Sequence, residues 1–271
     1  MARTANLGTA LVTGASSGIG ATYAERLAGR GYDLLLVARD VTRLNKLADT
    51  LSAKHGVKVE VLGADLSSQS DLKRVETRLR GDEAITLLVN NAGIGPKGPL
   101  LNDDIDYLDQ MIAINITAAN RLAVAAAQAF AARGKGGIVN IASGVAIVPE
   151  LFNGTYSGTK SFVLGMTQSL ARELDGKGVR IQAVLPGITA TELFDRVGGS
   201  VGNYPKEIVM HVENLVDAAL AGYDLGELVT IPSMEDQNLL QAFEAARAAL
   251  GGQVSRDTPA SRYGVTAKAA A

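Results

Sequence analysis

The sequence predicts a single-domain α/β fold, a doubly wound parallel seven-stranded sheet with helices on both faces. Short β-branched and leucine-rich runs alternate with longer helical patterns along the chain, and several of these runs are apolar without a break. Unbroken apolar runs are typical of strands that are buried on both faces. Parallel strands also need connections long enough to hold a crossover helix, and the chain provides them. The expected strands are residues 10–13, 34–37, 57–62, 85–89, 138–141, 179–185 and 228–231.

The helical patterns lie between these strands, at residues 19–30, 43–54 and 70–80 and later at 155–174. We expect one domain over residues 1–250. Within it, residues 189–211 carry glycines and a proline and are expected to form a mobile lid over the substrate. The tail, residues 251–271, is rich in Ala, Ser, Thr and Arg and is expected to be poorly ordered.

Composition excludes several classes of protein. The net charge of −2 offers no basic field, so neither nucleic acid nor an anionic membrane is an expected partner. No stretch approaches the roughly 18–20 apolar residues that span a bilayer. The chain has no cysteine, and its two histidines have no partner at ligand spacing, so no metal is expected. The first eight residues lack the apolar core of a secretion signal. These features predict a cytoplasmic enzyme or binding protein.

A glycine turn, TGASSGIG at residues 13–20, follows the first strand and opens a helix. Gly14 permits the sharp turn, Gly18 leaves room for a pyrophosphate, and Gly20 lets the helix approach the strand. The helix N-terminus adds N–H groups and partial positive charge. The other interpretation is a purely structural glycine-rich turn. Its position after the first strand favours a dinucleotide site, formed by Gly14, Ser16, Ser17, Gly18, Ile19 and Gly20.

The residue after the second strand normally selects between NAD and NADP. An acid there would bind the ribose hydroxyls, but this position is Ala38, followed by Arg39. A guanidinium pairs with a 2′-phosphate through charge-assisted bonds. Arg39, helped by Arg43, therefore predicts NADP(H) as the preferred cofactor. The alternative is that Arg39 is an ordinary surface arginine.

Polar and small residues also follow the third and fourth strands. Asp65 and the backbone of Leu66 are suited to bracket an adenine edge. Asn91, Ala92 and Gly93, within the sequence NNAG, allow the backbone to run against the adenine ribose. Each segment alone could be a helix cap or a turn, but both fall at strand ends along one edge of the sheet. This placement favours cofactor lining.

Tyr156 and Lys160 are four residues apart on an expected helix and therefore share one face. The lysine ammonium, joined by the positive charge of an oxidised nicotinamide, is expected to lower the tyrosine pKa from about 10 toward 7, so that the phenol can exchange a proton with a carbonyl or alcohol. Ser143, two residues beyond the fifth strand, is placed to bind the same substrate oxygen. Asn115 is polar among apolar neighbours. It either contacts Lys160 through water or satisfies helix backbone at a kink.

These motifs resemble the short-chain dehydrogenase/reductase family, over about residues 7–232 and in the family's order and spacing. The residues that carry the resemblance are TGASSGIG at 13–20, NNAG at 90–93, Asn115, Ser143, Tyr156, Lys160, Pro186 and Gly187. The resemblance implies a Rossmann fold with Asn115, Ser143, Tyr156 and Lys160 as a catalytic tetrad.

The resemblance further implies that Lys160 binds the nicotinamide ribose. It implies that the segment starting at Pro186-Gly187 holds the carboxamide, through the Thr189 backbone and the Thr191 hydroxyl. Members are commonly homodimers or homotetramers that pair the helices carrying Asn115 and Tyr156. The nearly uncharged stretch 118–132 is compatible with such pairing, and equally with a helix buried in its own chain.

Apolar residues dominate the expected substrate site, which predicts a hydrophobic ketone, aldehyde or secondary alcohol as the small-molecule partner. They are Val145, Ala146, Ile147, Val148, Leu151, Phe152, Leu193 and Phe194, and some of them are expected to belong to the core. The sequence thus predicts an NADP(H)-dependent oxidoreductase. The alternatives are a non-catalytic NADP(H)-binding regulator and an epimerase or dehydratase that retains its cofactor.

Overall fold

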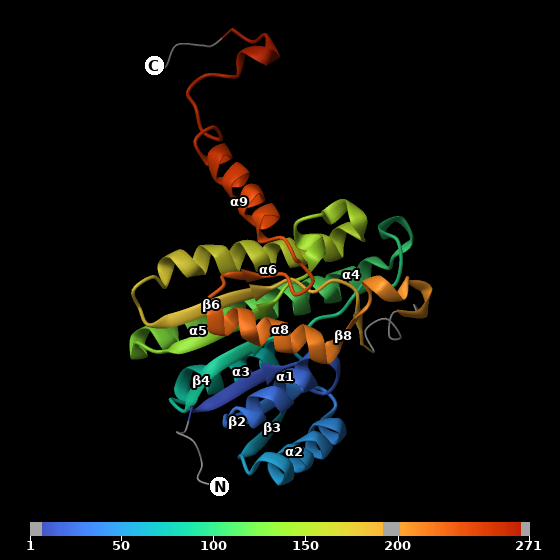
Figure 1. Ribbon diagram of the computed structural model, residues 1–271, viewed down its shortest axis with the longest axis vertical. Helices are drawn as coiled ribbons and strands as arrows, with labels where there is room; N and C mark the ends of the chain where they lie inside the picture. The colour runs from blue at the N-terminus through green and yellow to red at the C-terminus, as the bar shows by residue number, and fades with distance from the viewer. Residues whose placement is uncertain (1–6, 192–200, 267–271) are drawn as a thin grey trace. The chain divides into compact units, whose positions relative to one another are not determined.

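The structure, a computed structural model, describes residues 7–191 and 201–266. Contacts between residues divide the chain into two units, Met1–Ser233 and Met234–Ala271. The first unit contains all seven strands of the main sheet (Figure 1). The division falls after Ser233, whereas the sequence analysis placed the end of the domain at residue 250.

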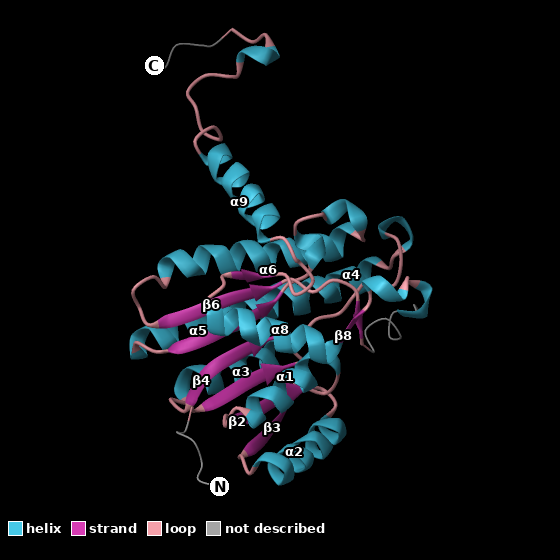
Figure 2. Cartoon of the chain, in the orientation of Figure 1, coloured by secondary structure: helices cyan, strands magenta, loops and turns pink. Residues whose placement is uncertain are grey.

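The main sheet is parallel throughout, with the strand order β3-β2-β1-β4-β5-β6-β9 (Figure 2). The order reverses between β1 and β4, so the loops after these two strands meet at one edge of the sheet. This arrangement confirms the predicted doubly wound α/β fold. The strands are β1 (Thr9–Thr13), β2 (Asp33–Ala38), β3 (Val59–Gly63), β4 (Ile85–Asn90), β5 (Gly136–Ile141), β6 (Val179–Val184) and β9 (Val229–Thr230).

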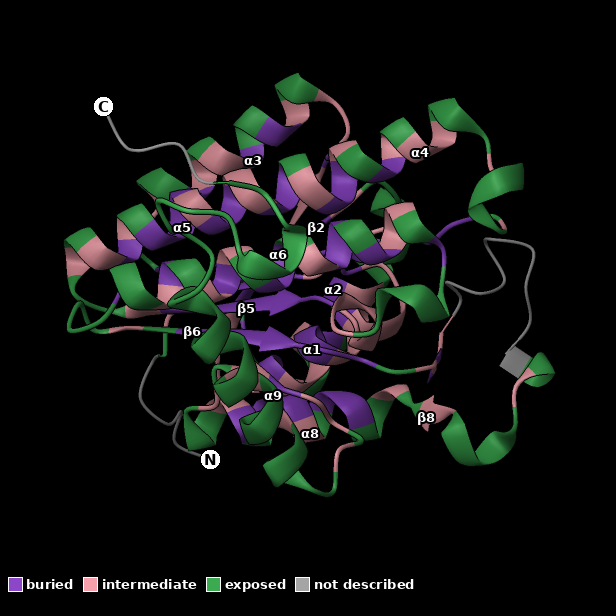
Figure 3. Ribbon diagram, turned by 90° about the horizontal axis from the view of Figure 1, so that it is seen from above, coloured by how far each residue is buried: buried purple, intermediate pink, exposed green. Residues whose placement is uncertain are grey.

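Helices cover both faces of this sheet, which explains why its strands are apolar on both sides. One core cluster joins Tyr23, Leu44 and Leu215 to the sheet; these come from α1 (Gly18–Gly29), α2 (Val41–His55) and α8 (Val212–Leu225). The other cluster lies on the opposite face, beneath α3 (Gln69–Gly81), α5 (Ala119–Arg133) and α6 (Gly154–Glu173). Figure 3 shows the buried strands β5 and β6 between these layers.

A second, small sheet joins the two ends of the segment that the sequence analysis expected to be a lid. Strand β7 (Thr189–Ala190) pairs in parallel with β8 (Met210–His211), and the Met210 amide donates to the Ile188 carbonyl at 2.9 Å. The base of the segment is therefore closed by backbone hydrogen bonds. Residues 192–200 lie outside the described residues, and the lid function stays a prediction.

The second unit contains helix α9 (Gln237–Gly251) and a short 3₁₀ turn, Ser261–Tyr263. The Asp236 carboxylate caps α9 by accepting a hydrogen bond from the Asn238 amide at 3.0 Å. None of the α9 residues is buried. The last residues of the expected tail, 267–271, lie outside the described residues.

Candidate active site

The glycine turn adopts backbone conformations that require glycine. Gly14 and Gly18 have φ angles of +66° and +53°. A methyl group added at Gly20 would lie 2.4 Å from the Gly14 carbonyl oxygen, so the start of α1 packs directly on the turn. At Gly18, an added methyl would meet only the Thr191 side chain, at 3.4 Å. The turn is therefore open at Gly18, on the side that faces Thr191.

The glycine turn leads directly into the N-terminus of α1. No side chain caps α1, and its first turn contains no acidic residue. By contrast, Asp40 caps α2, and Asp104 caps α4 (Ile105–Ile112). A helix start without its own side-chain acceptor offers N–H groups and partial positive charge to an anion. Together with the open side of Gly18, this arrangement fits a pyrophosphate.

Thr13, the last residue of β1, joins the two loops that meet where the strand order reverses. Its hydroxyl oxygen accepts hydrogen bonds from the amides of Asn91 and Ala92, at 2.9 and 3.0 Å. The Asn91 side chain returns a bond to the Thr13 carbonyl at 2.8 Å. The NNAG segment and the glycine turn are thus held together, at the place where the sequence analysis expected the adenine ribose.

The two arginines expected at the 2′-phosphate have different surroundings. Arg39 is exposed, and within residues 7–191 and 201–266 its guanidinium makes no hydrogen bond or ion pair. The pKa of Asp65 is lowered mainly by a hydrogen bond from the Ser67 hydroxyl. The positive charge of Arg39 lowers it further. Arg43 instead pairs with the Asp40 carboxylate at 3.5 Å. Arg39 is therefore the better placed of the two for a phosphate.

Asp65 and Leu66 lie next to this position, at the end of β3. Asp65 Oδ1 accepts bonds from the Ser67 amide and hydroxyl, at 2.9 and 2.7 Å, so this oxygen is already engaged. The Leu66 side chain is buried in the core. Only its backbone is left for the adenine contact that the sequence analysis expected.

Asn115 lies in a π-helical segment, Ala113–Ala118, and is buried. Its amide oxygen accepts from the Ile94 amide and its nitrogen donates to the Ile94 carbonyl, both at 2.9 Å. The same nitrogen donates to the Thr159 hydroxyl at 3.2 Å. Asn115 thus joins the loop after β4 to helix α6. It does not bond the helix backbone at a kink, as one of the two earlier interpretations required.

Lys160 is 5% exposed, and its ammonium donates to the Ile141 carbonyl at the end of β5, at 3.0 Å. A methyl group added at Gly93 would lie 3.5 Å from Lys160 Nζ and 3.1 Å from Asn115 Oδ1. The NNAG glycine therefore borders both polar groups. Burial lowers the pKa of Lys160 to about 8.

Tyr156 lies one helical turn before Lys160, with its ring 5.7 Å from the lysine Nζ. Burial raises the pKa of Tyr156 to about 12, and a hydrogen bond with the Ser143 side chain acts in the opposite direction. Ser143 also donates to the Pro186 carbonyl at 3.4 Å. The expected lowering of the tyrosine pKa toward 7 is therefore not seen in the chain itself, because burial outweighs the effect of the Ser143 side chain.

The segment after β6 is anchored beside Ser143. The Pro186 carbonyl accepts a bond from the Gly144 amide at 2.8 Å. The Thr189 side chain is buried and donates to the Gly187 carbonyl at 3.1 Å. Thr191 follows close to Gly18, as described above. The segment therefore extends from the Ser143 loop to the glycine turn, along the line that a dinucleotide would follow.

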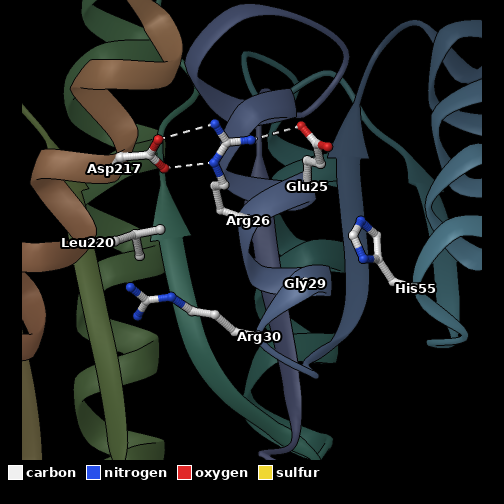
Figure 4. A pocket seen from close by; sticks show the side chains of 7 residues that line it. All are labelled: Glu25, Arg26, Gly29, Arg30, His55, Asp217 and Leu220. Atoms are coloured by element: carbon white, nitrogen blue, oxygen red, sulfur yellow. Dashed lines mark hydrogen bonds and ion pairs between the residues drawn. The ribbon is translucent and has the colours of Figure 1, made fainter. Parts of the chain in front are cut away.

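A surface pocket of about 440 Å³ lies away from these groups, along the C-terminal half of α1 (Figure 4). Its cations are engaged: Arg26 forms two bonds to Asp217, and Arg30 forms two bonds to Asp224. These ion pairs join α1 to α8. The charged side chains that line the pocket therefore have a structural role. The pocket is lined by Glu25, Arg26, Gly29, Arg30, His55, Asp217 and Leu220.

Within residues 7–191 and 201–266, the structure contains neither a cluster of metal ligands nor a membrane-spanning helix. No group of three His, Cys, Asp or Glu side chains is close enough to hold a metal ion in this part of the chain. No helix there is both long and apolar enough to cross a membrane.

Residues 8–200 match the family model of the short chain dehydrogenases. The chain belongs to the short-chain dehydrogenase/reductase family. This result confirms the resemblance carried by the motifs. The human very-long-chain 3-oxoacyl-CoA reductase (Homo sapiens) is 36% identical over 188 residues, which cover 68% of this chain and 60% of that protein. The chain thus spans less than two thirds of that relative's length.

Two solved structures of short-chain dehydrogenases are similar over nearly the whole chain. A short-chain dehydrogenase from Sphingobium yanoikuyae, solved in complex with NADPH, is 47% identical with a TM-score of 0.91, covering 94% of this chain and 98% of that one. The bulky-bulky ketone specific alcohol dehydrogenase from Comamonas testosteroni is 46% identical with a TM-score of 0.88, covering 95% and 99%.

The structure adds site residues of this family member that the sequence analysis did not single out. Thr13, Thr159 and Asn153 each accept a hydrogen bond from an expected catalytic or cofactor-binding residue; in this order the donors are Asn91, Asn115 and Tyr156. Asn153 had a sequence signal, because Asn directly before a helical pattern predicts an N-cap. Thr13 had a weaker one, as a polar residue that ends an apolar strand. Nothing in the local sequence indicates the partner of Thr159.

Proposed function

We propose that the protein is an NADP(H)-dependent oxidoreductase that interconverts a ketone or aldehyde with an alcohol on a mostly apolar small molecule. One observation carries the proposal. The Tyr156 ring lies 5.7 Å from the buried ammonium of Lys160 and interacts with the Ser143 side chain, at the edge of the sheet that also carries the glycine turn. The proposal is supported by the two solved relatives, one bound to NADPH and the other named for bulky ketones.

The residues at the carboxyl edge fit the cofactor. The uncapped start of α1 and the open side of Gly18 suit the pyrophosphate, and the exposed guanidinium of Arg39 suits a 2′-phosphate. Lys160, which borders Gly93, is placed for the nicotinamide ribose. When bound, the cofactor supplies the hydride for carbonyl reduction or accepts it in alcohol oxidation.

Tyr156 is the proton donor of the proposed reduction. Its high pKa keeps the phenol protonated at neutral pH, so the proton is available to a carbonyl oxygen that gains negative charge. The Ser143 hydroxyl is placed to donate a second hydrogen bond to the same oxygen. After the transfer, the positive charge of Lys160 stabilises the phenolate. Alcohol oxidation follows the same steps in reverse.

The apolar character of the substrate rests on the residues after Ser143. Ala146 and Ile147 pack against a core cluster, as expected of some residues in this set. Val148, Leu151 and Phe152 are exposed. Leu193 and Phe194 lie outside the described residues. None of the exposed three is charged, which favours a neutral apolar substituent on the substrate.

The test is NADPH consumption with a panel of ketones, for the wild type and for Tyr156→Phe. We expect turnover by the wild type, and a loss of at least about 100-fold in kcat for the variant with unchanged NADPH affinity. Tyr263→Phe, at an exposed tyrosine of the second unit, is the matched control. Tight NADPH binding without turnover would favour a non-catalytic regulator. Retained activity in Tyr156→Phe would show that another group is the acid.

The assembly belongs to the same proposal, as a homodimer or homotetramer. The buried face of α5, including Leu122, Ala126 and Phe130, packs within its own chain against the sheet, so its lack of charge does not by itself indicate a partner. Light scattering of the purified protein gives the oligomer size. A monomer at all concentrations would contradict this part of the proposal.

A further inference from the structure

Four large apolar side chains are exposed on the two segments that meet at the start of α6, and we refer to them as the apolar rim: Leu100, Leu101, Leu151 and Phe152. Their exposed fractions are 44%, 98%, 71% and 41%. Leu100 and Leu101 lie in the 3₁₀ turn Leu100–Asn102 after β4, whereas Leu151 ends the 3₁₀ turn Pro149–Leu151 before α6 and Phe152 follows it. Figure 1 shows both segments near the N-terminal end of α6.

The rim is continuous with the candidate active site. The ring of Phe152 stands edge-on to the ring of Tyr156, with 5.5 Å between their centroids. On the other side, a methyl group added at Gly154 would lie 3.2 Å from Leu100 Cδ2, so Leu100 contacts the first turn of α6. Both halves of the rim therefore meet at the helical turn that carries the proposed acid.

A single buried amide holds the two halves together. Asn153 is buried, with only 7% of the residue exposed. Its oxygen accepts from the amides of Thr155 and Tyr156, at 3.0 and 3.2 Å, and so caps α6. Its nitrogen donates to the Gly98 carbonyl at 2.9 Å and to Asp103 Oδ2 at 3.3 Å. The same group thus fixes Tyr156 and the loop that carries Leu100 and Leu101.

We propose that the apolar rim is an outer substrate subsite for a bulky, neutral apolar substituent of the ketone, with Asn153 as the positioning residue that holds its two sides together. The inference rests on the proposed function and adds to it the residues that select the substrate. An exposed apolar patch that touches a reacting group is suited to part of a substrate. The carboxylates of Asp104 and Glu150 flank the rim and disfavour an anionic substituent.

The rim is tested with two ketones that share one side and differ on the other, acetophenone and hexanophenone, each reduced with NADPH. Leu101→Gln and Leu151→Gln replace side chains so exposed that folding does not depend on them. We expect each to lower the ratio of kcat/KM for hexanophenone to kcat/KM for acetophenone about tenfold. Leu225→Gln, at a leucine 79% exposed on α8, is the matched control and should leave the ratio unchanged.

The role of Asn153 is tested by exchanging its amide with the carboxylate of Asp103. Asn153→Asp keeps the helix cap but loses the donor to Gly98 and places two carboxylates together. We expect it to lower the same ratio about tenfold. The double variant Asn153→Asp/Asp103→Asn restores a donor and an acceptor between positions 153 and 103, and should recover much of the ratio. A purely structural role would lower both kcat/KM values together and leave the ratio unmoved.

The outcomes separate the two proposals. If the wild type reduces no member of the ketone panel, the proposed function fails and the subsite fails with it. If it reduces other ketones but neither of these two, the subsite is refuted while the proposed function stands. If both ketones are reduced and the ratio is unchanged in the rim variants and in Asn153→Asp, the subsite is refuted while the proposed function stands. If the rim variants change the oligomeric state in light scattering and not the ratio, the rim is an interface between copies of the chain and the inference is overturned.

Discussion

Replacing Lys160 by methionine should remove a specific pH dependence of stability. Burial lowers the pKa of this lysine from 10.5 to about 8. As the pH rises, the folded protein loses this proton near pH 8, and the unfolded chain loses it near its ordinary pKa. Between these two values the unfolded chain binds more protons, so the free energy of unfolding increases with pH. At about 1.4 kcal/mol for each pKa unit, the increase is about 3 kcal/mol.

The measurement is urea unfolding followed by far-ultraviolet circular dichroism, since the chain has no tryptophan. Wild type and Lys160→Met are compared at several pH values from about 7 to about 10. The free energy of unfolding of the wild type minus that of the variant should rise by about 2–3 kcal/mol over this range. Subtraction cancels the groups common to both proteins, including the buried tyrosines. Lys177→Met, at an exposed lysine, should show no such trend.

The absolute stability at neutral pH is less informative than the trend. Methionine removes the cost of a buried ammonium, but it also leaves the Ile141 carbonyl without its donor, a loss of about 1–3 kcal/mol. The two effects nearly cancel. A difference between wild type and variant that stays flat across the pH range would refute the reasoning, because it would mean that Lys160 keeps its ordinary pKa in the folded protein.

Three further predictions concern the cofactor edge. Arg39→Asp should raise the KM for NADPH relative to NADH at least about tenfold, and an unchanged ratio in steady-state kinetics would remove Arg39 from its assigned role. Gly20→Ala should lower the free energy of unfolding by about 1–3 kcal/mol, because its methyl meets the Gly14 carbonyl, and a stability equal to wild type in urea melts would contradict that contact. Thr13→Val should cost about 2–4 kcal/mol in the same melts, since two amides lose their acceptor; a loss under about 0.5 kcal/mol would show that water replaces it.

Much of the fold could be predicted from the sequence because long unbroken apolar runs identify buried parallel strands. The sixth strand, for example, was expected at residues 179–185 and spans Val179–Val184. The small sheet of β7 and β8 was missed, since two-residue strands carry no periodic pattern. Helix α9 was not among the expected elements, although Asp236 precedes it as an N-cap.

The sequence could also predict which residues form the candidate site, because their types and spacing place them at the ends of neighbouring strands. It could not predict their partners. Asn115 was expected to contact Lys160 through water or to bond its own helix, and its direct bonds go to the Ile94 backbone and Thr159. Arg43 was expected to assist Arg39, and it pairs with Asp40. Such pairings depend on the close packing of loops that are far apart in the sequence.

The sequence by itself determined the family and the alternation of strands and helices along the chain, since both follow from local patterns and the spacing of motifs. Only the tertiary structure decided the electrostatics of the candidate site. The spacing of Tyr156 and Lys160 predicts that the lysine charge lowers the tyrosine pKa, yet the pKa of Tyr156 is raised to about 12. The reason is physical. The spacing of a tyrosine and a lysine can be read from the local sequence. The desolvation that raises the pKa of the phenol depends on every segment packed around it, and these segments are far apart in the sequence.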